Sequence, residues 1–552
     1  MWNVIGFASL ITGSITVVTY CGARYLGHRL SPTHSGKWTL QDGDIPEDLA
    51  GWVRIPWTEP DRNLLKFWVD KGIPHRTGIR NLSNNRVLMA LLFSRSKVPE
   101  VNEFIMTLRR SGRTGSTHKL HPRADYDFDL NSWATILHLF GDDPTVLYPE
   151  TVEHITSVMM APDRTRPSIF VPWTLGTFLE TENHVLMTEG SYYLCSKWLE
   201  DRERLRGSDH PSVKDREAFL TRYLDSILHK GFYEFNSDPY SSYTLHALLN
   251  LDGFSSENIR NKARELLDRT FFFYRIGSLS DRRYPPFRRR MDRSSVTSLK
   301  EDGARPFMVT WEDGRKAEEV IGPAHALVGS LLPYRPPLWT EQNCQWAGKA
   351  FTAMLGHGPR SSPEIYSKGK GFLITAGGVH RGSISRIVNR PTTLLLDDGA
   401  DDLSEVAHIG GLGADQRKFN NTGVVRNIAV GPGPVTVPDD WTGKVNGIWT
   451  IYDRPGTSIM VHSRRGFGIL CVLQNSAPSN DLAIINEDRE RLVREFRWNG
   501  ARSATYDVHS PNDRWSVLSL DGIRTDRRID LWPKLRIIDD PENEGPPLRF
   551  NR

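Results

Sequence analysis

The sequence contains few cysteines and little excess charge. Four cysteines are spread over 552 residues, and none lies in a CxxC pattern or at a Cys/His spacing typical of zinc sites. They are Cys21, Cys195, Cys344 and Cys471. A cysteine zinc site and a fold held together by disulfide bonds are therefore disfavoured. The formal net charge is only +4, so the sequence has no overall signature of a nucleic-acid-binding protein, and we expect no nucleic-acid partner.

Charged residues are also absent from the beginning of the chain. Positions 4–18 are predominantly apolar, and the first charged side chain is that of Arg24. This pattern is typical of a signal peptide or an N-terminal membrane anchor, which we place at residues 1–35. No positively charged segment precedes the apolar run, which favours a retained anchor. We therefore expect a secreted, periplasmic or cell-surface protein, with membrane anchoring through this segment as one form of it.

The length and the pattern of apolar residues predict two further domains. A single hydrophobic core stops growing at about 250–300 residues, so a chain of 552 residues should form at least two cores. We place a helical domain with a connector at residues 36–345 and an antiparallel β-sandwich at residues 346–552. The connector, residues 281–345, is rich in proline and charged residues.

The two domains are predicted from different periodicities. Helical spacing of apolar residues predicts helices at 87–93, 101–108, 133–139, 152–160, 178–199, 219–228, 242–251 and 259–273. Gly231 is expected to end the helix at 219–228. Short runs rich in Val, Ile, Thr and Leu, separated by Gly, Pro, Asn and Asp, predict strands at 371–376, 392–396, 448–452 and 468–473.

Two segments of the helical domain carry side chains suited to catalysis. Asn183 and His184 place an amide donor beside a titratable imidazole, although such a pair taken alone more often caps a turn and bonds within the core. A loop crowded with polar and aromatic residues follows Gly231 and leads into a helix. Its candidate residues are Glu234, Asn236, Tyr240 and Tyr243. One intervening helix and two connections would bring both segments to the same rim.

A third segment lies in the predicted β-domain. Gly377 and Gly378 would allow the backbone to approach a ligand and would direct His380 away from the sheet, although a solvent-facing histidine at a hairpin is the alternative. A later strand ends in an acidic turn with Asp397, Asp398, Asp401 and Asp402. These side chains could bind a hard cation such as calcium, but such a turn is more often only a turn.

In the order and spacing of these residues, the chain resembles polysaccharide lyases that join an incomplete (α/α) toroid to an antiparallel β-sandwich, the alginate-lyase and heparinase II/III-like group. In that group an Asn-His pair is followed, after about one helical hairpin, by a loop and helix with a catalytic tyrosine, and a glycine-rich strand end presents a histidine. The resemblance implies Asn183, His184, Tyr243 or Tyr240, and His380 as catalytic residues, with Glu234 and Asn236 contacting substrate. It implies cleavage of a uronic-acid-containing acidic polysaccharide by β-elimination.

A basic segment follows the last strong helix. Its cationic residues are Arg282, Arg283, Arg288, Arg289, Arg290 and Arg293, interleaved with Tyr284 and Phe287. Guanidinium groups pair bidentately with carboxylates and sulfates, so Arg282, Arg283 and Arg288 are predicted to bind the acidic polymer. The alternatives are a solvated connector and an anionic membrane surface near the N-terminal anchor.

Two other functions compete with the lyase. A glycoside hydrolase on a toroid needs two carboxyl groups about 5–10 Å apart, and Glu182, Glu189 and Glu234 are its candidates. A non-catalytic polysaccharide-binding protein would depend on aromatic and arginine contacts instead. No cofactor is predicted, with a structural calcium or zinc ion left as an alternative. For the lyase we expect the Asn183, His184 and tyrosine side chains to line one cleft that His380 faces.

Overall fold

The fold is that of a computed structural model of the chain. It describes residues 19, 21–22, 51–74, 82–107, 127–160, 167–170, 177, 179–202, 213–238, 240–288, 296–312, 324–340, 342–343, 347–355, 364–377, 387–388, 390–410, 423–425, 427–432, 434–447, 449–464, 467–474, 497–498, 503–509, 514–520 and 535–538. The predicted leader at residues 1–35 falls almost entirely outside these residues. Within the described chain no helix is long and apolar enough to cross a membrane.

Helices occupy the chain from Arg62 to Leu331. They are α2 (Arg62–Val69), α3 (Leu82–Phe93), α4 (Val98–Met106), α5 (Asp127–Phe140), α6 (Pro149–Met159), α7 (Glu182–Val185), the π-helical turn η1 (Leu186–Gly190), α8 (Ser191–Glu200), α9 (Val213–Lys230), α10 (Tyr240–Phe254), α11 (Glu257–Ile276), α12 (Arg305–Trp311) and α13 (Ala324–Leu331). The helices expected from apolar spacing are present, except that the one expected to begin at residue 178 begins at Glu182.

Local sequence signals explain several helix ends. The Asp61 carboxylate accepts hydrogen bonds from the backbone N–H groups of Asn63 and Leu64 and so caps the first turn of α2. Gly231 adopts a φ of 68°, a conformation that costs glycine little, and its N–H donates to the carbonyl of Ile227. The prediction that Gly231 ends the preceding helix is confirmed.

Antiparallel strands follow the helices. The described strands are β1 (Phe287–Arg288), β2 (Phe351–Leu355), β3 (Glu364–Gly369), β4 (Phe372–Gly377), β5 (Ile387–Val388), β6 (Thr392–Leu396), β7 (His408–Ile409), β8 (Gly423–Val425), β9 (Ile428–Pro432), β10 (Val435–Thr436), β11 (Gly443–Asn446), β12 (Trp449–Arg454), β13 (Thr457–Arg464), β14 (Phe467–Gln474), β15 (Arg497–Trp498), β16 (Ser503–His509), β17 (Arg514–Leu520) and β18 (Leu535–Ile538). The prediction of helices followed by antiparallel strands is confirmed.

Two larger sheets share one apolar core. One has the strand order β10-β7-β6-β4-β3-β2-β18 and the other β11-β12-β13-β14-β9-β8. Their buried side chains, such as Ile374 and Leu394 of the first sheet and Ile459 and Leu470 of the second, form a single cluster. The sheets thus pack face to face, as alternating inward-facing side chains predict.

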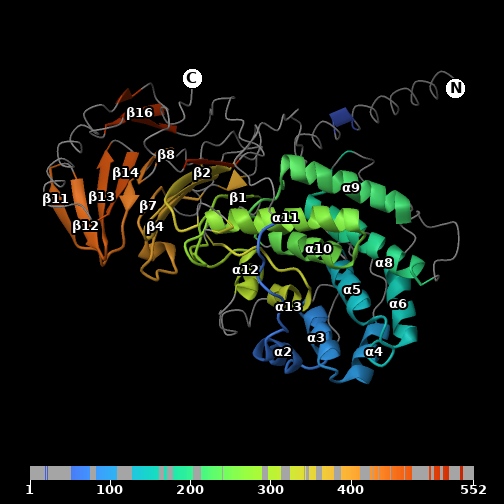
Figure 1. The fold of residues 1–552 in the computed structure, drawn as a ribbon. Helices are drawn as coiled ribbons and strands as arrows, with labels where there is room; N and C mark the ends of the chain where they lie inside the picture. Colours follow the sequence, from blue (N-terminus) through green and yellow to red (C-terminus); the bar gives the residue numbers. More distant parts are fainter. Residues whose placement is uncertain are drawn as a thin grey trace, which may run out of the picture.

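The helical and β parts are joined through α11. Figure 1 shows α11 running from the helices toward the sheets, with its C-terminal end beside the strands. Phe272 and Ile276 at that end belong to the same buried cluster as Tyr366 of β3 and Leu373 of β4. In addition, β1 of the connector pairs with β5, with Phe287 opposite Val388. The junction is therefore a packed core and not an open linker.

Alanine substitutions at two separate glycines test how tightly this junction is packed. A Cβ atom at Gly277, which follows α11, would lie 2.8 Å from ring atoms of the buried Tyr366. At Gly253 in α10 it would lie 3.7 Å from its nearest neighbour, Pro333. We expect Gly277→Ala to lower the free energy of unfolding by about 1–3 kcal/mol through overpacking. Gly253→Ala should change it by less than about 1 kcal/mol, in the stabilising direction.

Denaturant unfolding of the two variants provides the measurement. Equal stability of both variants would show that the end of α11 and β3 are not in close contact.

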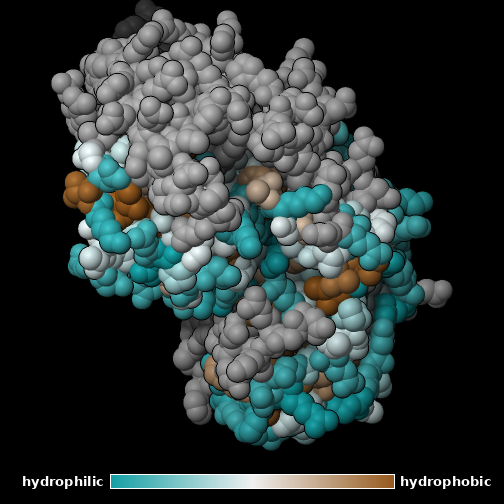
Figure 2. Space-filling view, turned by 60° about the vertical axis from the view of Figure 1, so that its left-hand side comes forward, coloured by the Kyte–Doolittle hydropathy of each residue, from teal (hydrophilic) through white to brown (hydrophobic). Residues whose placement is uncertain are grey.

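Among the coloured residues on the face seen in Figure 2, most are hydrophilic, and the hydrophobic areas are small and separate. Scattered apolar residues of this kind are common on protein surfaces.

Candidate functional site

Helix α10 presents two faces with different chemistry. Tyr243, His246 and Asn250 follow one another at helical spacing and face the neighbouring helices α5 and α13. Ser241, Thr244 and Leu245 lie on another face and line a pocket near the β-domain. The same helix therefore contributes to a polar centre among the helices and to a separate cavity.

The polar centre is built around a buried arginine. One terminal nitrogen of Arg86, on α3, lies 3.5 Å from Nδ1 of His246 and 3.4 Å from Nδ1 of His325, which belongs to α13. The other donates to the Ser132 hydroxyl at 3.0 Å. Burial lowers the pKa of Arg86 to about 10, while Tyr243 and Asp129 oppose that shift. This pKa is still high enough for Arg86 to remain positively charged near neutral pH.

A hydrogen-bond network holds the centre in place. The hydroxyl of Thr135 lies 2.9 Å from Nε2 of His246 and donates to Oδ1 of Asn250 at 2.8 Å. The amide of Asn250 in turn donates to both oxygens of Asn131, on α5. Because each polar group here is bonded to the next, the side chains of α5 and α10 have little freedom to rotate.

A row of rings connects this centre to His184. The Phe128 ring packs edge-on against the rings of both His184 and Tyr243, with centroid distances of 5.6 Å and 4.6 Å. Tyr243 continues the row to His325, 5.2 Å away. His184 and Tyr243 are therefore no farther apart than the sum of the two distances to Phe128. Figure 1 shows that α5, α10 and α13, which carry the last three rings, lie together in the helical part.

Asn183 has a buried donor beside this row. Its side chain is fully buried, and its oxygen accepts a hydrogen bond from the Thr181 hydroxyl. Its amide nitrogen has no hydrogen-bond partner among the residues that the structure describes. A buried amide donor without a partner costs free energy, so such a group often serves a ligand.

The segment after His184 is irregular. Five residues, Leu186–Gly190, form a π-helical turn, a feature frequent at functional sites. Glu189 of this turn pairs with Arg216 of α9 at 2.7 Å, and both side chains are almost fully buried. The turn is thus fixed by a charge pair inside the helical core.

Several predicted site residues come together, and others do not. Tyr243 and His184 share Phe128, whereas Tyr240 begins α10. Glu234, Asn236 and Arg283 line the pocket near the β-domain. His380 lies outside the described residues, so its predicted approach to the site stays a prediction.

The expected open cleft is not found at Asn183 and His184, whose side chains are 0% and 3% exposed. They lie where α7 packs against α10, so the helix contact covers them. Phe128 and Tyr243 are only partly buried. The ring row is therefore reached from the Phe128 and Tyr243 side.

The expected exposed basic segment is also not found at its first two residues. Arg282 is 4% exposed and donates to the main-chain carbonyls of Ala400 and Leu396, both at 2.8 Å. Arg283 is 5% exposed and bonds Asn236 at 2.9 Å. Both guanidinium groups connect segments that lie far apart in the chain.

Arg288 lies in β1 opposite Ile387, and its side chain is outside the description, as are Arg289, Arg290 and Arg293.

The acidic turn in the β-domain forms structural contacts. Asp398 lies 3.7 Å from nitrogens of both Arg282 and Arg454, and Asp401 pairs with Lys300 at 2.8 Å. Asp402 accepts from the Ser404 N–H at 2.9 Å. In the described chain no group of His, Cys, Asp and Glu side chains is arranged to hold a metal ion.

Two of the three hydrolase candidates, Glu182 and Glu189, are committed to other contacts. Glu189 pairs with Arg216, and Glu182 accepts the backbone N–H of Glu234 at 2.6 Å. A general acid and a second carboxylate must instead face a sugar from opposite sides. This geometry favours Glu182 and Glu189 as residues that hold the site in shape.

Sequence reasoning missed Arg86, Phe128, His246 and His325. Arg86 directly precedes the apolar run 87–93, where a charged residue on a buried helix face is a signal of an interior role. His246 follows Tyr243 at the spacing that places both on one helix face. Phe128 and His325 have no comparable signal, because their contacts with Tyr243 join distant parts of the chain.

The buried histidines predict a loss of stability in acid. Burial lowers the pKa of His138 to about 4 and also lowers the pKa values of His246 and His325. The unfolded chain, with an ordinary histidine pKa of about 6.5, then binds more protons than the folded chain below that pH. The contribution of these histidines to the free energy of unfolding is therefore fully present above about pH 6.5, and it is lost as the pH falls toward 4.

Because of His138 alone, the free energy of unfolding at pH 5 should be about 1–2 kcal/mol lower than at pH 7.5. Denaturant unfolding at the two pH values measures this difference, which His138→Gln should reduce by about that amount. His229→Gln, which replaces an exposed histidine on α9, should leave it unchanged. Identical pH dependence in all three proteins would contradict the assignment.

No family model matches the chain, and no curated protein matches it significantly. The function must therefore be argued from the geometry just described.

Proposed function

We propose that this protein is a polysaccharide lyase that cleaves a uronic-acid-containing acidic polysaccharide by β-elimination. The observation that carries the proposal is the placement of His184 and Tyr243 against the same ring, that of Phe128. Both rings contact Phe128, so one bound sugar would reach both once His184, which is 3% exposed, is uncovered on substrate binding.

Elimination sets three chemical tasks. The uronate carboxylate must be neutralised so that the proton on C5 becomes acidic, that proton must be removed, and the leaving oxygen on C4 must be protonated. The electron pair of the C5–H bond forms the C4–C5 double bond as the C4–O bond breaks. The reaction needs no water and no oxidant.

Three side chains would carry out these tasks. Asn183, whose amide nitrogen has no partner among the described residues, would donate to the carboxylate as charge develops on it. His184 would act as base or would neutralise the carboxylate, depending on the epimer. Tyr243 would protonate the leaving oxygen and could also be the base. His380, from the β-domain, would complete the site.

Arg86 would support Tyr243. It is a fully buried cation that interacts electrostatically with Tyr243, and it is held between His246 and His325. A cation there stabilises the negative charge that the phenol oxygen acquires when the proton is transferred. Arg86 thus acts through Tyr243 and is a positioning residue.

We further propose the architecture that this function implies. The helices from α3 to α11 would form an incomplete (α/α) toroid, since helices near in sequence, such as α5 and α8 or α9 and α11, pack against each other. The two sheets that share a core would form the antiparallel β-sandwich. Acidic polysaccharides occur outside cells, so a secreted, periplasmic or surface-anchored protein would meet them.

The test uses the purified protein with alginate, heparan, chondroitin, hyaluronan and pectin, while ultraviolet absorbance is followed. Elimination leaves a C4–C5 double bond conjugated with the carboxylate, which absorbs, whereas hydrolysis does not. Rising absorbance with one polymer supports the lyase. New reducing ends without absorbance would indicate a hydrolase. Binding without turnover of any polymer would indicate a sugar-binding protein.

A further inference from the structure

The row of rings in the helical part has two different ends. Its contacts place the members in the order His184, Phe128, Tyr243 and His325. His184 is buried, whereas His325 is partly exposed, as are Phe128 and Tyr243. The part of the row that a bound sugar can reach therefore extends past Tyr243 to His325.

The guanidinium of Arg86 fixes which nitrogen of His325 carries the proton. One of its terminal nitrogens lies 3.4 Å from Nδ1 of His325. A guanidinium only donates hydrogen bonds, so Nδ1 is the acceptor and the proton is on Nε2. The two nitrogens of an imidazole point in different directions, and the Nε2–H group is consequently directed away from Arg86.

The imidazole of His325 also stays neutral. Desolvation among the helices, and next to it the positive charge of Arg86, hold the pKa of His325 well below its usual value. A second proton would have to sit on Nδ1, facing the guanidinium. His325 therefore presents an N–H donor near neutral pH, and the cation behind the ring polarises this donor.

The elimination proposed above gives the row a direction. His184 would act at C5 or at the carboxylate of the uronate, and Tyr243 would protonate the oxygen on C4. When the bond between C4 and this oxygen breaks, the oxygen leaves with the next sugar, as the anomeric hydroxyl of that sugar. Because Tyr243 stands between the two histidines in the row, the leaving sugar lies on the side of His325.

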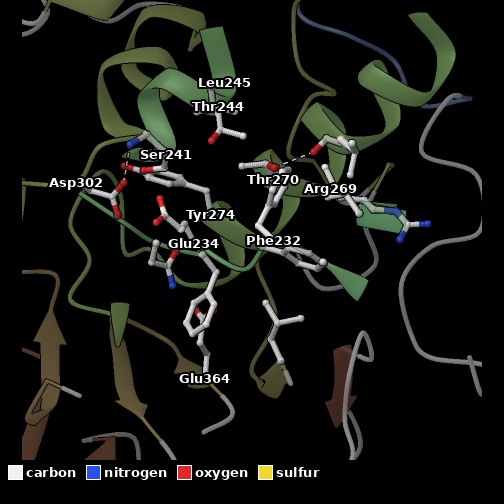
Figure 3. Close-up of a pocket in the computed structure, with 18 of the residues that line it drawn as sticks. Phe232, Glu234, Ser241, Thr244, Leu245, Arg269, Thr270, Tyr274, Asp302 and Glu364 are labelled. Atoms are coloured by element: carbon white, nitrogen blue, oxygen red, sulfur yellow. Dashed lines mark hydrogen bonds between the residues drawn. The ribbon is translucent and has the colours of Figure 1, made fainter. Parts of the chain in front are cut away.

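The opposite face of α10 does not offer a place for this sugar. Thr244 and Leu245 of that face line the pocket shown in Figure 3, together with Glu234 and Tyr274. The pocket has a volume of about 100 Å³. An apolar cavity of roughly 150 Å³ holds one benzene molecule, and a sugar ring with its hydroxyl groups is larger than benzene. The leaving sugar therefore does not fit into this pocket.

We propose that His325 binds the leaving sugar, with its Nε2–H group donating a hydrogen bond to an acceptor oxygen of that sugar. This inference rests on the proposed elimination and names a residue that selects its substrate. His325 contacts the sugar without transferring a proton, since Nε2 already carries one. Arg86 acts through His325 and positions this donor.

The experiment compares two substrates that differ only on the leaving side. One is an oligosaccharide of the polymer that the unchanged protein cleaves. In the other, a trifluoroethoxy group replaces the leaving sugar on C4. Trifluoroethanol and a sugar's anomeric hydroxyl have similar acidity, so the chemistry at C4 and C5 is kept while the sugar is lost. Both reactions form the conjugated double bond and are followed by ultraviolet absorbance.

Three variants of the full chain are compared with the unchanged protein. His325→Phe keeps a ring beside Tyr243 but has no donor, and should lower kcat/KM about five- to tenfold for the oligosaccharide and less than about twofold for the trifluoroethyl substrate. His325→Gln places an amide N–H near the position of Nε2 and should stay within about threefold on both. His246→Gln alters the buried histidine that also contacts Arg86, and should leave the ratio of the two values unchanged.

Equal losses on the two substrates in His325→Phe would overturn the inference, because His325 would then act only by packing against Tyr243. If the unchanged protein cleaves none of the polymers, the proposed elimination fails and this inference with it. A protein that cleaves but shows an unaltered ratio refutes the role of His325 alone. If His325→Phe does not fold, His325→Asn, which keeps an amide facing Arg86 and has no group at the position of Nε2, takes its place.

The tautomer of His325 is tested without any substrate. In the full chain with isotope-labelled histidine, nitrogen NMR should show an unprotonated Nδ1 and a protonated Nε2 for His325 at about pH 6 and pH 8 alike. The signals are assigned by their loss in His325→Gln. A proton on Nδ1 would overturn the inference, because Nε2 would then have no hydrogen to donate to the sugar.

Discussion

Tyr243→Phe should reduce the elimination rate by about 10²–10⁴-fold, whereas Tyr240→Phe should leave the rate within about threefold of that of the unchanged protein. The two changes are chemically identical and lie on the same helix, one turn apart. Tyr243 packs against the Phe128 ring that His184 also contacts, whereas Tyr240 is the first residue of α10. The substitution removes the hydroxyl and leaves the ring, so the row of aromatic rings stays packed.

His184→Ala should reduce the elimination rate by a factor similar to that of Tyr243→Phe, because the imidazole would remove the C5 proton or neutralise the carboxylate. Absorbance at saturating polymer gives kcat, and a polymer titration gives KM. A change confined to KM would assign these residues to substrate binding instead. The reverse result for the tyrosines, with Tyr240→Phe inactive and Tyr243→Phe active, would move the site to the N-terminal end of α10.

The order of helices and strands could be predicted because single segments encode it. The apolar spacing at 219–228 and Gly231 after it predict a helix and its end, and α9 ends at Lys230. The run at 392–396 predicts a strand, and β6 has the same bounds. In each case the residues that determine the element lie within it or directly after it, so no distant contact had to be known.

The candidate site could be predicted only in part, for the opposite reason. The proximity of His184 and Tyr243 was expected from their separation along the chain, but Phe128, which lies between them, belongs to another helix. For Arg282 the prediction of an exposed side chain is wrong. Its sequence neighbours suggest an exposed basic segment, whereas the carbonyl groups that bury it are those of Leu396 and Ala400. Burial depends on partners more than a hundred residues away.

The π-helical turn that follows Asn183 and His184 contains one member of a buried charge pair, and breaking that pair should lower the stability strongly. Arg216 and Glu189 are 2.7 Å apart, with side chains 2% and 0% exposed. Arg216→Met leaves the Glu189 carboxylate buried without its guanidinium. We expect the free energy of unfolding to fall by about 3–5 kcal/mol. Lys66→Met, which breaks the exposed pair with Asp70 on α2, should cost less than about 0.5 kcal/mol.

A double variant separates the value of the pair from the cost of a stranded charge. Arg216→Met combined with Glu189→Leu removes both charges and fills much of the space, so it should recover most of the stability lost in Arg216→Met alone. Denaturant unfolding of the single and double variants measures the coupling. If the double variant is less stable than Arg216→Met, the carboxylate has a further role, for which its hydrogen bond from the Ser168 N–H at 3.2 Å is the candidate. Elimination by the double variant then tests the π-helical turn: recovered stability with lost activity would mean that the charge pair positions His184 and does more than hold the core together.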